Sequence, residues 1–405
     1  VGSEMCIRDR SLTLFIIFTF ILTLNVKGQT KYSSATVAFY NVENLFDTIK
    51  SVGYVNGTLP FNDKNYHIQI AESDISKYET EEFKQSYTYE NIKGKKIIRP
   101  LILQEEFLPN GNKRWNTEKY FQKVNNISKV ISELGADVTG SAPVIVGICE
   151  IETRETLEDL AKSSALKKYD YGVVHFNSFD ARGVDTGLLY QKSRFKVIDA
   201  RPHPIFNYDA EGKRKYTRDI LQVTGLLDGE EITFLVNHWP SRSGGEKVSM
   251  PARMEAAKVM KGIFDELKSK NPNAKVIAMG DFNDDPISPS IKNTFDPAGE
   301  IAKVSDNGYY DPMLPLYKKG VGTLAYRDAW NLFDQFISTS SLVTKNKDYS
   351  TYKIFKTEIY NKDYLKAKEG AYKGFPNRMW SGDTYRANGY SDHFPVYTIL
   401  LKQAK

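Results

Sequence analysis

The sequence predicts a mixed-sheet α/β sandwich. Six strand-like apolar runs each carry acidic, amide or histidine side chains at one end, and they span residues 35–46, 143–152, 231–241, 274–286, 331–339 and 389–400. Helical patterns lie between some of these runs, without the strict alternation of strand and helix that a parallel barrel requires. The composition, with 41% apolar and 26% charged residues, is that of a globular protein. We therefore expect several strand ends to converge on one mouth.

The N-terminal region has the pattern of an export signal. Ser11–Leu24 is an apolar stretch preceded by two arginines, and it is short for a transmembrane helix. Small residues just after it predict cleavage following Gly28, so residues 1–28 are expected to be a signal peptide and 29–405 a single domain. The first ten residues do not resemble a natural leader and are set apart as an artefact. The expected location is secreted or periplasmic.

Helical spacing marks three segments. Apolar residues from Asn116 to Leu134, including Phe121, recur every three or four positions, and Gly135 ends the pattern. Thr153–Leu166 has a similar amphipathic pattern. Pro251 is expected to open a third helix, in a first-turn position that suits proline.

The predicted strands are Thr36–Phe46, Pro143–Ile151, Tyr171–His175, Val184–Gln191, Ile232–His238, Phe333–Ser338 and Ser391–Leu401, besides the run that begins at Ala274. Residues 51–110 and 346–388 are predicted to be insertions, and Ile287–Gly322 to be rich in loops. The first insertion is polar and tyrosine-rich, and its residue types do not indicate a role.

Charge and cysteine content exclude some classes of site. The formal charge of +5 is mild for 405 residues and does not by itself indicate nucleic-acid binding. Only Cys6 and Cys149 occur, so the chain has neither a disulfide framework nor a cysteine zinc site. Cys149 lies inside an apolar run and is expected to behave as a small buried hydrophobe.

The stretch Ala274–Pro286 (AKVIAMGDFNDDP) shows the strand-end pattern most clearly. Its apolar run ends at Gly280, and Asp281 and Asn283 follow directly. A buried strand that delivers a carboxylate and an amide suits a site on a rigid scaffold. An Asp- and Asn-rich turn is the alternative interpretation. A calcium loop fits poorly, because its sixth position is proline instead of glycine and its twelfth is lysine instead of glutamate.

Together these motifs resemble the endonuclease/exonuclease/phosphatase superfamily, the group of deoxyribonuclease I, exonuclease III, sphingomyelinases and inositol polyphosphate phosphatases. The resemblance rests on N-V-E at 41–43, Glu150 after a buried strand, N-H-W at 237–239, G-D-F-N at 280–283 and S-D-H at 391–393. Within the superfamily, the chain is similar above all to secreted bacterial members that contain the motifs F-Y-N-V-E-N-L-F-D, D-x-R-G-[IV]-D and N-H-W-P-S-R. The resemblance covers most of residues 35–401 and implies a four-layered sandwich of two packed mixed β-sheets flanked by helices.

A divalent-cation site follows from the resemblance and from the residue types. Carboxylate and carbonyl oxygens suit Mg²⁺ or Mn²⁺. Glu150 is the first candidate ligand, because a lone acid that ends an apolar strand is costly to bury without a cation. Glu43 and Asp392 align with family positions that contribute to metal binding, and Asn41 with an asparagine near the metal. Glu152 is a lesser candidate.

The resemblance also implies catalytic roles. Asp281 would orient or deprotonate the attacking water, and Asn283 would hold the phosphate. His393 would contact the phosphate as a hydrogen-bond donor or acid/base, with Asp334 fixing its tautomer and orientation. His238 would meet the phosphate or the leaving group. Which group acts as base and which as acid stays open.

Three further residues are candidates for substrate binding. Arg182 and Arg218 are plausible phosphate clamps, because a guanidinium binds phosphate through two hydrogen bonds. The alternative is a salt bridge with Asp180 or Asp219. Asn237 lies beside His238 at the same strand end and is included as a substrate-binding candidate.

The expected function is a secreted, metal-dependent phosphoesterase that hydrolyses phosphodiester bonds, with a nuclease acting on DNA or RNA as the first reading. A lipid or small-molecule phosphoesterase, like a sphingomyelinase or an inositol-phosphate phosphatase, is the alternative. A binding domain without catalytic activity on the same fold is a third reading. We expect no stable membrane insertion, and the sequence indicates no protein partner.

Overall fold

Each of the two large sheets contains one parallel pair of strands near its centre. The computed structural model describes residues 31–54, 70–71, 89–90, 96–97, 100–102 and 104–404, apart from 179, 210, 213, 327 and 383. The predicted signal peptide and much of the insertion 51–110 lie outside the described residues.

In the first sheet β1 and β7 are parallel, and Asn41 lies opposite Cys149. Its strand order is β20 (Lys353–Ile359), β23 (Val396–Gln403), β1 (Tyr32–Leu45), β7 (Ile145–Ile151), β9 (Asp185–Gln191) and β8 (Tyr171–His175).

The second sheet repeats this arrangement with β14 and β15 as its parallel pair. His238, the last residue of β14, lies opposite Asp281, the last residue of β15. The strand order is β10 (Phe195–His203), β13 (Ile220–Leu227), β14 (Glu230–His238), β15 (Val276–Asp281), β19 (Asp334–Thr339) and β16 (Tyr309–Tyr310). The parallel pairs therefore carry predicted site residues at their carboxyl ends.

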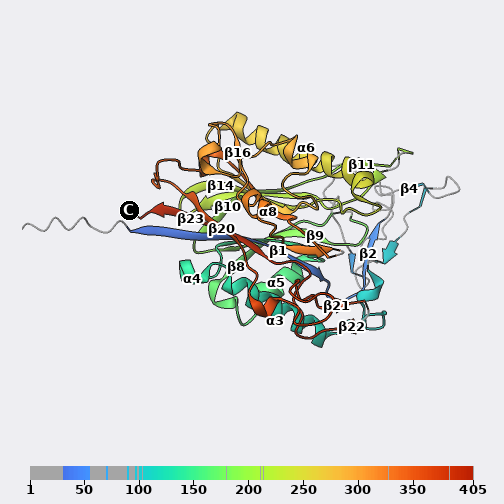
Figure 1. Cartoon of the computed structure of the whole chain (residues 1–405). Helices are drawn as coiled ribbons and strands as arrows, with labels where there is room; N and C mark the ends of the chain where they lie inside the picture. The colour runs from blue at the N-terminus through green and yellow to red at the C-terminus, as the bar shows by residue number, and fades with distance from the viewer. Residues whose placement is uncertain are drawn as a thin grey trace, which may run out of the picture.

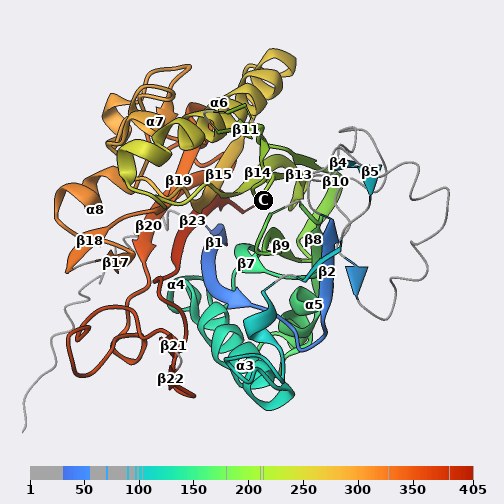
Figure 2. The same cartoon turned by 90° about the vertical axis from the view of Figure 1, so that its right-hand side faces the viewer.

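Helices cover the outer faces of both sheets, as Figures 1 and 2 show. One apolar core lies between the first sheet and its helices, a second between the two sheets, and a third between the second sheet and α6. This arrangement confirms the predicted four-layered sandwich. The α-helices are α3 (Thr117–Glu133), α4 (Ala136–Thr139), α5 (Arg154–Lys162), α6 (Glu246–Lys270), α7 (Pro289–Lys292) and α8 (Leu314–Lys318).

Helix α3 begins and ends close to the predicted positions. The Asn116 side chain caps its first turn by accepting from Lys119 N, and Gly135 follows its end with a positive φ. The predicted buried face is confirmed except at one residue, because Phe121 is 45% exposed and Tyr120 is buried in its place. Lys123 also lies on the buried face and is completely covered.

Helix α6 begins earlier than expected, so the prediction that Pro251 opens it is wrong. The helix begins at Glu246, directly after Gly244 and Gly245, which both have positive φ. Pro251 therefore lies inside the helix and removes one hydrogen-bond donor. The proline and Lys247, whose carbonyl loses that donor, are both exposed, so water can satisfy the carbonyl.

Three strand predictions need correction. The last strand begins at Val396 and not at Ser391, since Pro395 has no N–H for a strand ladder. Residues 346–388 are not wholly an insertion, because β20 pairs with β23 and completes the first sheet. Strands β10 and β13 were not predicted, and they form an antiparallel pair at one side of the second sheet.

Short elements fill the remaining chain. A small sheet is formed by β2 (Ser51–Tyr54), β3 (Ile70–Ala71) and β6 (Pro100–Ile102), and four two-stranded pairs are β4 (Tyr89–Glu90) with β5 (Lys96–Ile97), β11 (Asn207–Tyr208) with β12 (Arg214–Lys215), β17 (Leu324–Tyr326) with β18 (Ala329–Asn331), and β21 (Trp380–Ser381) with β22 (Thr384–Tyr385). The 3₁₀ helices are η2 (Glu105–Phe107), η3 (Lys167–Tyr169), η4 (Ile301–Lys303), η5 (Ser340–Leu342) and η6 (Asp363–Leu365). In the part of the chain that the structure describes, no helix has the length and apolar character needed to span a membrane.

Candidate active site

The predicted site residues gather where the two parallel strand pairs end. Asn41 and Glu43 come from β1, Glu150 from β7, His238 from β14 and Asp281 from β15. The remaining members are contributed by the start of β19 and by the loop before β23, namely Asp334, Asp392 and His393. The convergence expected from the strand-end pattern is therefore present.

The backbone at these strand ends is strained. Glu43, Glu150 and Asn283 have φ values of 52°, 62° and 49°, in the left-handed region that costs a non-glycine residue about 1–3 kcal/mol. Such a turn ends the regular alternation of side chains and redirects the acid or amide. Gly280 has a different reason to be glycine, because a Cβ there would lie 2.4 Å from the Asn237 carbonyl oxygen.

His393 and Asp334 form a buried pair. His393 Nδ1 lies 2.7 Å from Asp334 Oδ2, and the Asp334 side chain is completely buried. Burial alone would lower the pKa of His393, but the Asp334 carboxylate outweighs it and holds the pKa well above its usual value. The charged form of the imidazole is therefore favoured, and its Nε2 lies 3.8 Å from Asp281 Oδ2.

His238 has the opposite character. Burial, assisted by the positive charges of Arg218 and Arg182, keeps the pKa of His238 well below its usual value. Its Nε2 lies 3.7 Å from Asp281 Oδ2 and 3.8 Å from Glu150 Oε1. A neutral imidazole and a charged one thus face the same Asp281 oxygen, which is a common way to separate acid and base roles.

Asp281 is held by amide groups on both sides. Its Oδ2 accepts a 3.1 Å hydrogen bond from Asn41 Nδ2, and its Oδ1 accepts from Asn283 N at 2.9 Å. Burial is the main reason that the pKa of Asp281 is raised to about 6; nearby Asp334 raises it further, and His393 opposes both. The Asn283 amide donates to the Trp239 carbonyl at 2.9 Å. At neutral pH, Asp281 is an ionised carboxylate poised between two imidazoles.

Glu150 is paired with Arg182 at the mouth of the site. Arg182 Nη2 lies 3.1 Å from Glu150 Oε1, and Asn44 N donates to Oε2 at 2.9 Å. Burial would raise the pKa of Glu150, but Arg182 reverses the effect and lowers it. Glu152, the lesser metal candidate, instead accepts from Asp47 N at 2.8 Å and belongs to a neighbouring carboxyl pair.

Glu43 and Asp392 share a cation that the sequence did not indicate, Arg378. Arg378 Nε lies 3.0 Å from Glu43 Oε1, and its Nη2 lies 2.9 Å from Asp392 Oδ2. The second Glu43 oxygen accepts from Met379 N at 3.1 Å, and buried Lys123 donates to the Glu43 carbonyl. Burial and the negative charge of Asp392 nevertheless raise the pKa of Glu43 to about 7.

The donor set is compatible with a hydrated divalent cation. Among the described residues, no three His, Cys, Asp or Glu side chains are arranged to enclose a metal ion. Mg²⁺ requires no such cage, since it commonly binds one or two carboxylates and retains water. Burial is the main reason that the pKa of Glu43 is raised to about 7, and a cation beside Glu43, Glu150 and Asp392 would favour its ionised form.

Arg218 and Asn237 are predicted substrate contacts whose polar atoms bind protein groups. Arg218 donates to the carbonyls of His238 and Trp239 and pairs with Asp180 at 3.0 Å. Asn237 accepts from Trp239 Nε1 at 3.0 Å and donates to backbone carbonyls. These contacts match the alternative, structural reading of Arg218. Arg182 pairs with Glu150, and its side chain remains 40% exposed.

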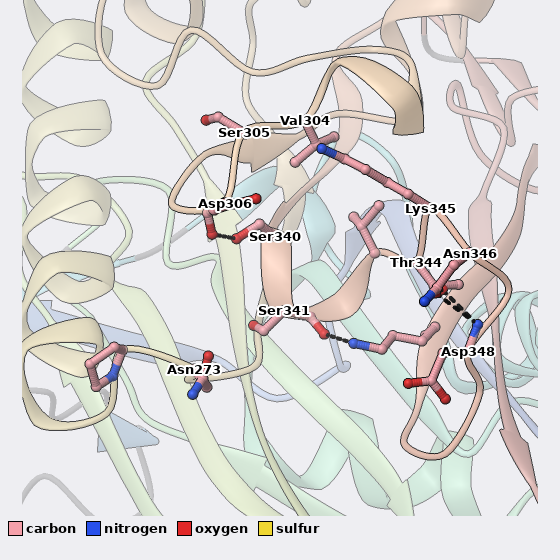
Figure 3. Close-up of a pocket in the computed structure, with 13 residues that line it drawn as sticks. Asn273, Val304, Ser305, Asp306, Ser340, Ser341, Thr344, Lys345, Asn346 and Asp348 are labelled. Atoms are coloured by element: carbon pink, nitrogen blue, oxygen red, sulfur yellow. Dashed lines mark hydrogen bonds between the residues drawn. The ribbon is translucent and has the colours of Figure 1, made fainter.

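A separate hollow of about 430 Å³ lies at the other end of the sandwich, beside the start of β15 and the end of β19. Its lining is mainly polar and includes Ser305, Ser341 and Lys345, as Figure 3 shows. Lys353 donates to the Ser341 carbonyl at its edge. None of the predicted site residues lines this hollow.

Two site residues were missed for different reasons. Arg378 lies in the stretch 360–390, which has only short strands and no apolar run. No periodic pattern around Arg378 therefore indicated that it belongs to the site. Lys123 had a signal, because it is three residues after buried Tyr120 and four before buried Ile127, on the apolar face of α3. A lysine in that position indicates either a buried ion pair or a carbonyl to bind.

Comparisons with known proteins give one family and several similar structures. The endonuclease/exonuclease/phosphatase family model matches residues 85–402. A family protein from Bacteroides thetaiotaomicron is 15% identical over 92% of this chain and 97% of its own, with a TM-score of 0.45. A mannosyl-6-phosphatase from the same organism is 16% identical over 90% of this chain and 99% of its own, also with a TM-score of 0.45.

D. rerio TDP2, complexed with a single-strand DNA product, is 15% identical over 68% of this chain and 92% of its own, with a TM-score of 0.41. Curated proteins give no significant match. With identities of 15–16% and TM-scores below 0.5, these similarities say nothing about the activity or the substrate of this chain. The family model, in contrast, spans most of the sequence, including every site residue described above except Asn41 and Glu43. On that match, the chain belongs to the endonuclease/exonuclease/phosphatase family.

Proposed function

We propose that this protein is a secreted, divalent-metal-dependent phosphoesterase that cleaves phosphodiester bonds, with nucleic acid as its substrate. Enzymes of this family are hydrolases that act on phosphoesters and generally use divalent metals. The observation that carries the proposal is the position of Asp281 Oδ2, which lies 3.7 Å from His238 Nε2 and 3.8 Å from His393 Nε2. Glu150 Oε1 also lies 3.8 Å from His238 Nε2.

This arrangement assigns a role to each side chain. Charged His393 would donate a hydrogen bond to a phosphate oxygen, and Asp334 would hold the ring in the required orientation. Asp281 would orient the attacking water and accept its proton, with Asn41 and Asn283 fixing the carboxylate. His238 would contact the phosphate or the leaving group. Glu150, Glu43 and Asp392 would hold the cation, which neutralises phosphate charge and activates water.

Two groups beside the site support nucleic acid as the substrate. Arg182 is half-exposed at the mouth and is a suitable phosphate contact. Trp330 is 37% exposed and stacks on Phe394, the neighbour of His393, with ring centroids 6.0 Å apart. An exposed indole near a phosphate site can stack on a base, an interaction worth about 1–3 kcal/mol per base.

A substrate panel with and without chelator tests the proposal. The purified protein is incubated with supercoiled DNA, single-stranded RNA, bis-p-nitrophenyl phosphate, a sugar phosphate and sphingomyelin vesicles. Cleavage of nucleic acid should be lost with EDTA and return with Mg²⁺ or Mn²⁺. Full activity in metal-free buffer would contradict metal dependence. Turnover of the sugar phosphate or sphingomyelin alone would instead establish the small-molecule or lipid reading.

A further inference from the structure

Arg378 occupies the position between two carboxylates that the proposed metal site requires. Its guanidinium binds Glu43 through Nε at 3.0 Å and Asp392 through Nη2 at 2.9 Å. A divalent cation that takes Glu43 Oε1 or Asp392 Oδ2 would have to share that oxygen with the guanidinium. A fixed positive charge at this distance also repels the incoming ion. Arg378 and the cation therefore compete for the same oxygens.

The segment that carries Arg378 is held firmly while its guanidinium stays accessible. Figures 1 and 2 show β21 and β22 beside α3. Asn126 of α3 donates to the carbonyls of Ala387 and Gly389 at 2.9 and 2.8 Å, and Tyr364 donates to Glu133 at 2.6 Å. The Arg378 side chain is nevertheless 45% exposed. The side chain can move without undocking the segment.

A guanidinium displaced from these carboxylates would be available to bind another anion. The two arginines lie on different carboxylates of the cluster, Arg182 on Glu150 and Arg378 on Glu43 and Asp392. A phosphate bound beside the cation supplies new acceptors for a planar donor fork. Arg378 would thus exchange its ion pairs with the carboxylates for an ion pair with the substrate phosphate.

We propose that Arg378 is an internal counter-cation of the metal site, which neutralises Glu43 and Asp392 in the absence of metal and moves to the substrate phosphate when the ion binds. This inference rests on the proposed function, because it takes Glu43 and Asp392 as metal ligands. It gives Arg378 two effects of opposite sign. The residue weakens cation binding, and it strengthens binding of a phosphate to the cation-loaded site.

Isothermal titration calorimetry on Arg378→Gln tests both effects without turnover. Titration with Mn²⁺ should show binding about tenfold tighter than in the wild type, the scale at which partners of metal ligands act. Titration with inorganic phosphate at saturating Mn²⁺ should show binding weaker by a similar factor. Arg386→Gln is the matched control: it removes one positive charge from the same segment, and both affinities should stay at wild-type values.

The outcomes separate this inference from the proposed function. Unchanged or weaker Mn²⁺ binding in Arg378→Gln would overturn the inference, since a residue that merely supports the ligands weakens the site when it is removed. Tighter Mn²⁺ binding with unchanged phosphate binding would overturn the transfer to substrate. If the wild type itself binds no divalent cation, the proposed function fails. Circular dichroism of each variant checks that the fold is retained.

Discussion

Replacing Asp334 by asparagine tests whether it acts with His393 as one unit. The carboxylate is completely buried and accepts a 2.7 Å hydrogen bond from His393 Nδ1. Loss of a hydrogen bond to a charged group costs about 1.5–3 kcal/mol. If that bond only orients the ring, kcat should fall roughly 10- to 150-fold. His393→Ala removes the ring itself and should cost about 10²- to 10⁴-fold, the range of a positioned acid or base.

The assay is kcat on bis-p-nitrophenyl phosphate at saturating Mg²⁺, measured for the wild type, the two single variants and the double variant. Because residues that act as a unit are not additive, the double variant should lose little more than His393→Ala alone. Asp311→Asn removes another fully buried carboxylate, in a different part of the second sheet, and should leave kcat unchanged. Losses that multiply in the double variant would refute the reasoning.

Two further predictions follow from the described contacts, and a third follows from the sequence of the N-terminal region. Arg218→Ala should lower the free energy of unfolding by about 3–5 kcal/mol in urea, because it leaves Asp180 buried without its ion-pair partner, whereas Arg201→Ala, which breaks an exposed pair with Asp199, should change it little. Wild-type stability with a raised KM would restore Arg218 as a phosphate clamp. Burial raises the pKa of Asp311 to about 7, so its ionisation costs stability progressively from about pH 4 to 7. The wild type should therefore lose about 2 kcal/mol of unfolding free energy relative to Asp311→Asn between pH 5 and 7, measured by urea unfolding, and parallel curves would contradict this. Expressed with its own start, the protein should be exported and begin near Gln29, and an intact N-terminus on a cytoplasmic product would count against a signal peptide.

Strand ends could be predicted because two kinds of local signal coincide there. A buried apolar run indicates where a strand lies, and a polar residue that breaks the run indicates where the strand leaves the core. Glu150, His238 and Asp281 each carry both signals, and the structure places His238 Nε2 within 4 Å of both carboxylates. The contacts of Asp281 with Asn41 and His393 follow from the pairing and packing of strands distant in sequence.

The residues that sequence reasoning missed or misread depend on tertiary contacts. Arg378 meets Glu43 across 335 positions of sequence, and nothing near either residue indicates the pairing. Asn237 and Arg218 have the right chemistry for a substrate contact, but their polar groups bind Trp239 and its neighbours within the fold. Pro251 was assigned a helix start because propensity favours it there, and the preceding Gly245 decides the actual start.

The distance between the two sheets determines whether the site can form at all. Glu150 belongs to one sheet and Asp281 to the other, so the packing of β7 on β15 sets their separation. Gly147, in the middle of β7, lies against Met279, and a Cβ at Gly147 would meet the Met279 side chain at 3.0 Å. The absence of a side chain there allows the sheets to approach closely. The geometry at the mouth therefore depends on core packing, three residues before Glu150 on one strand and two before Asp281 on the other.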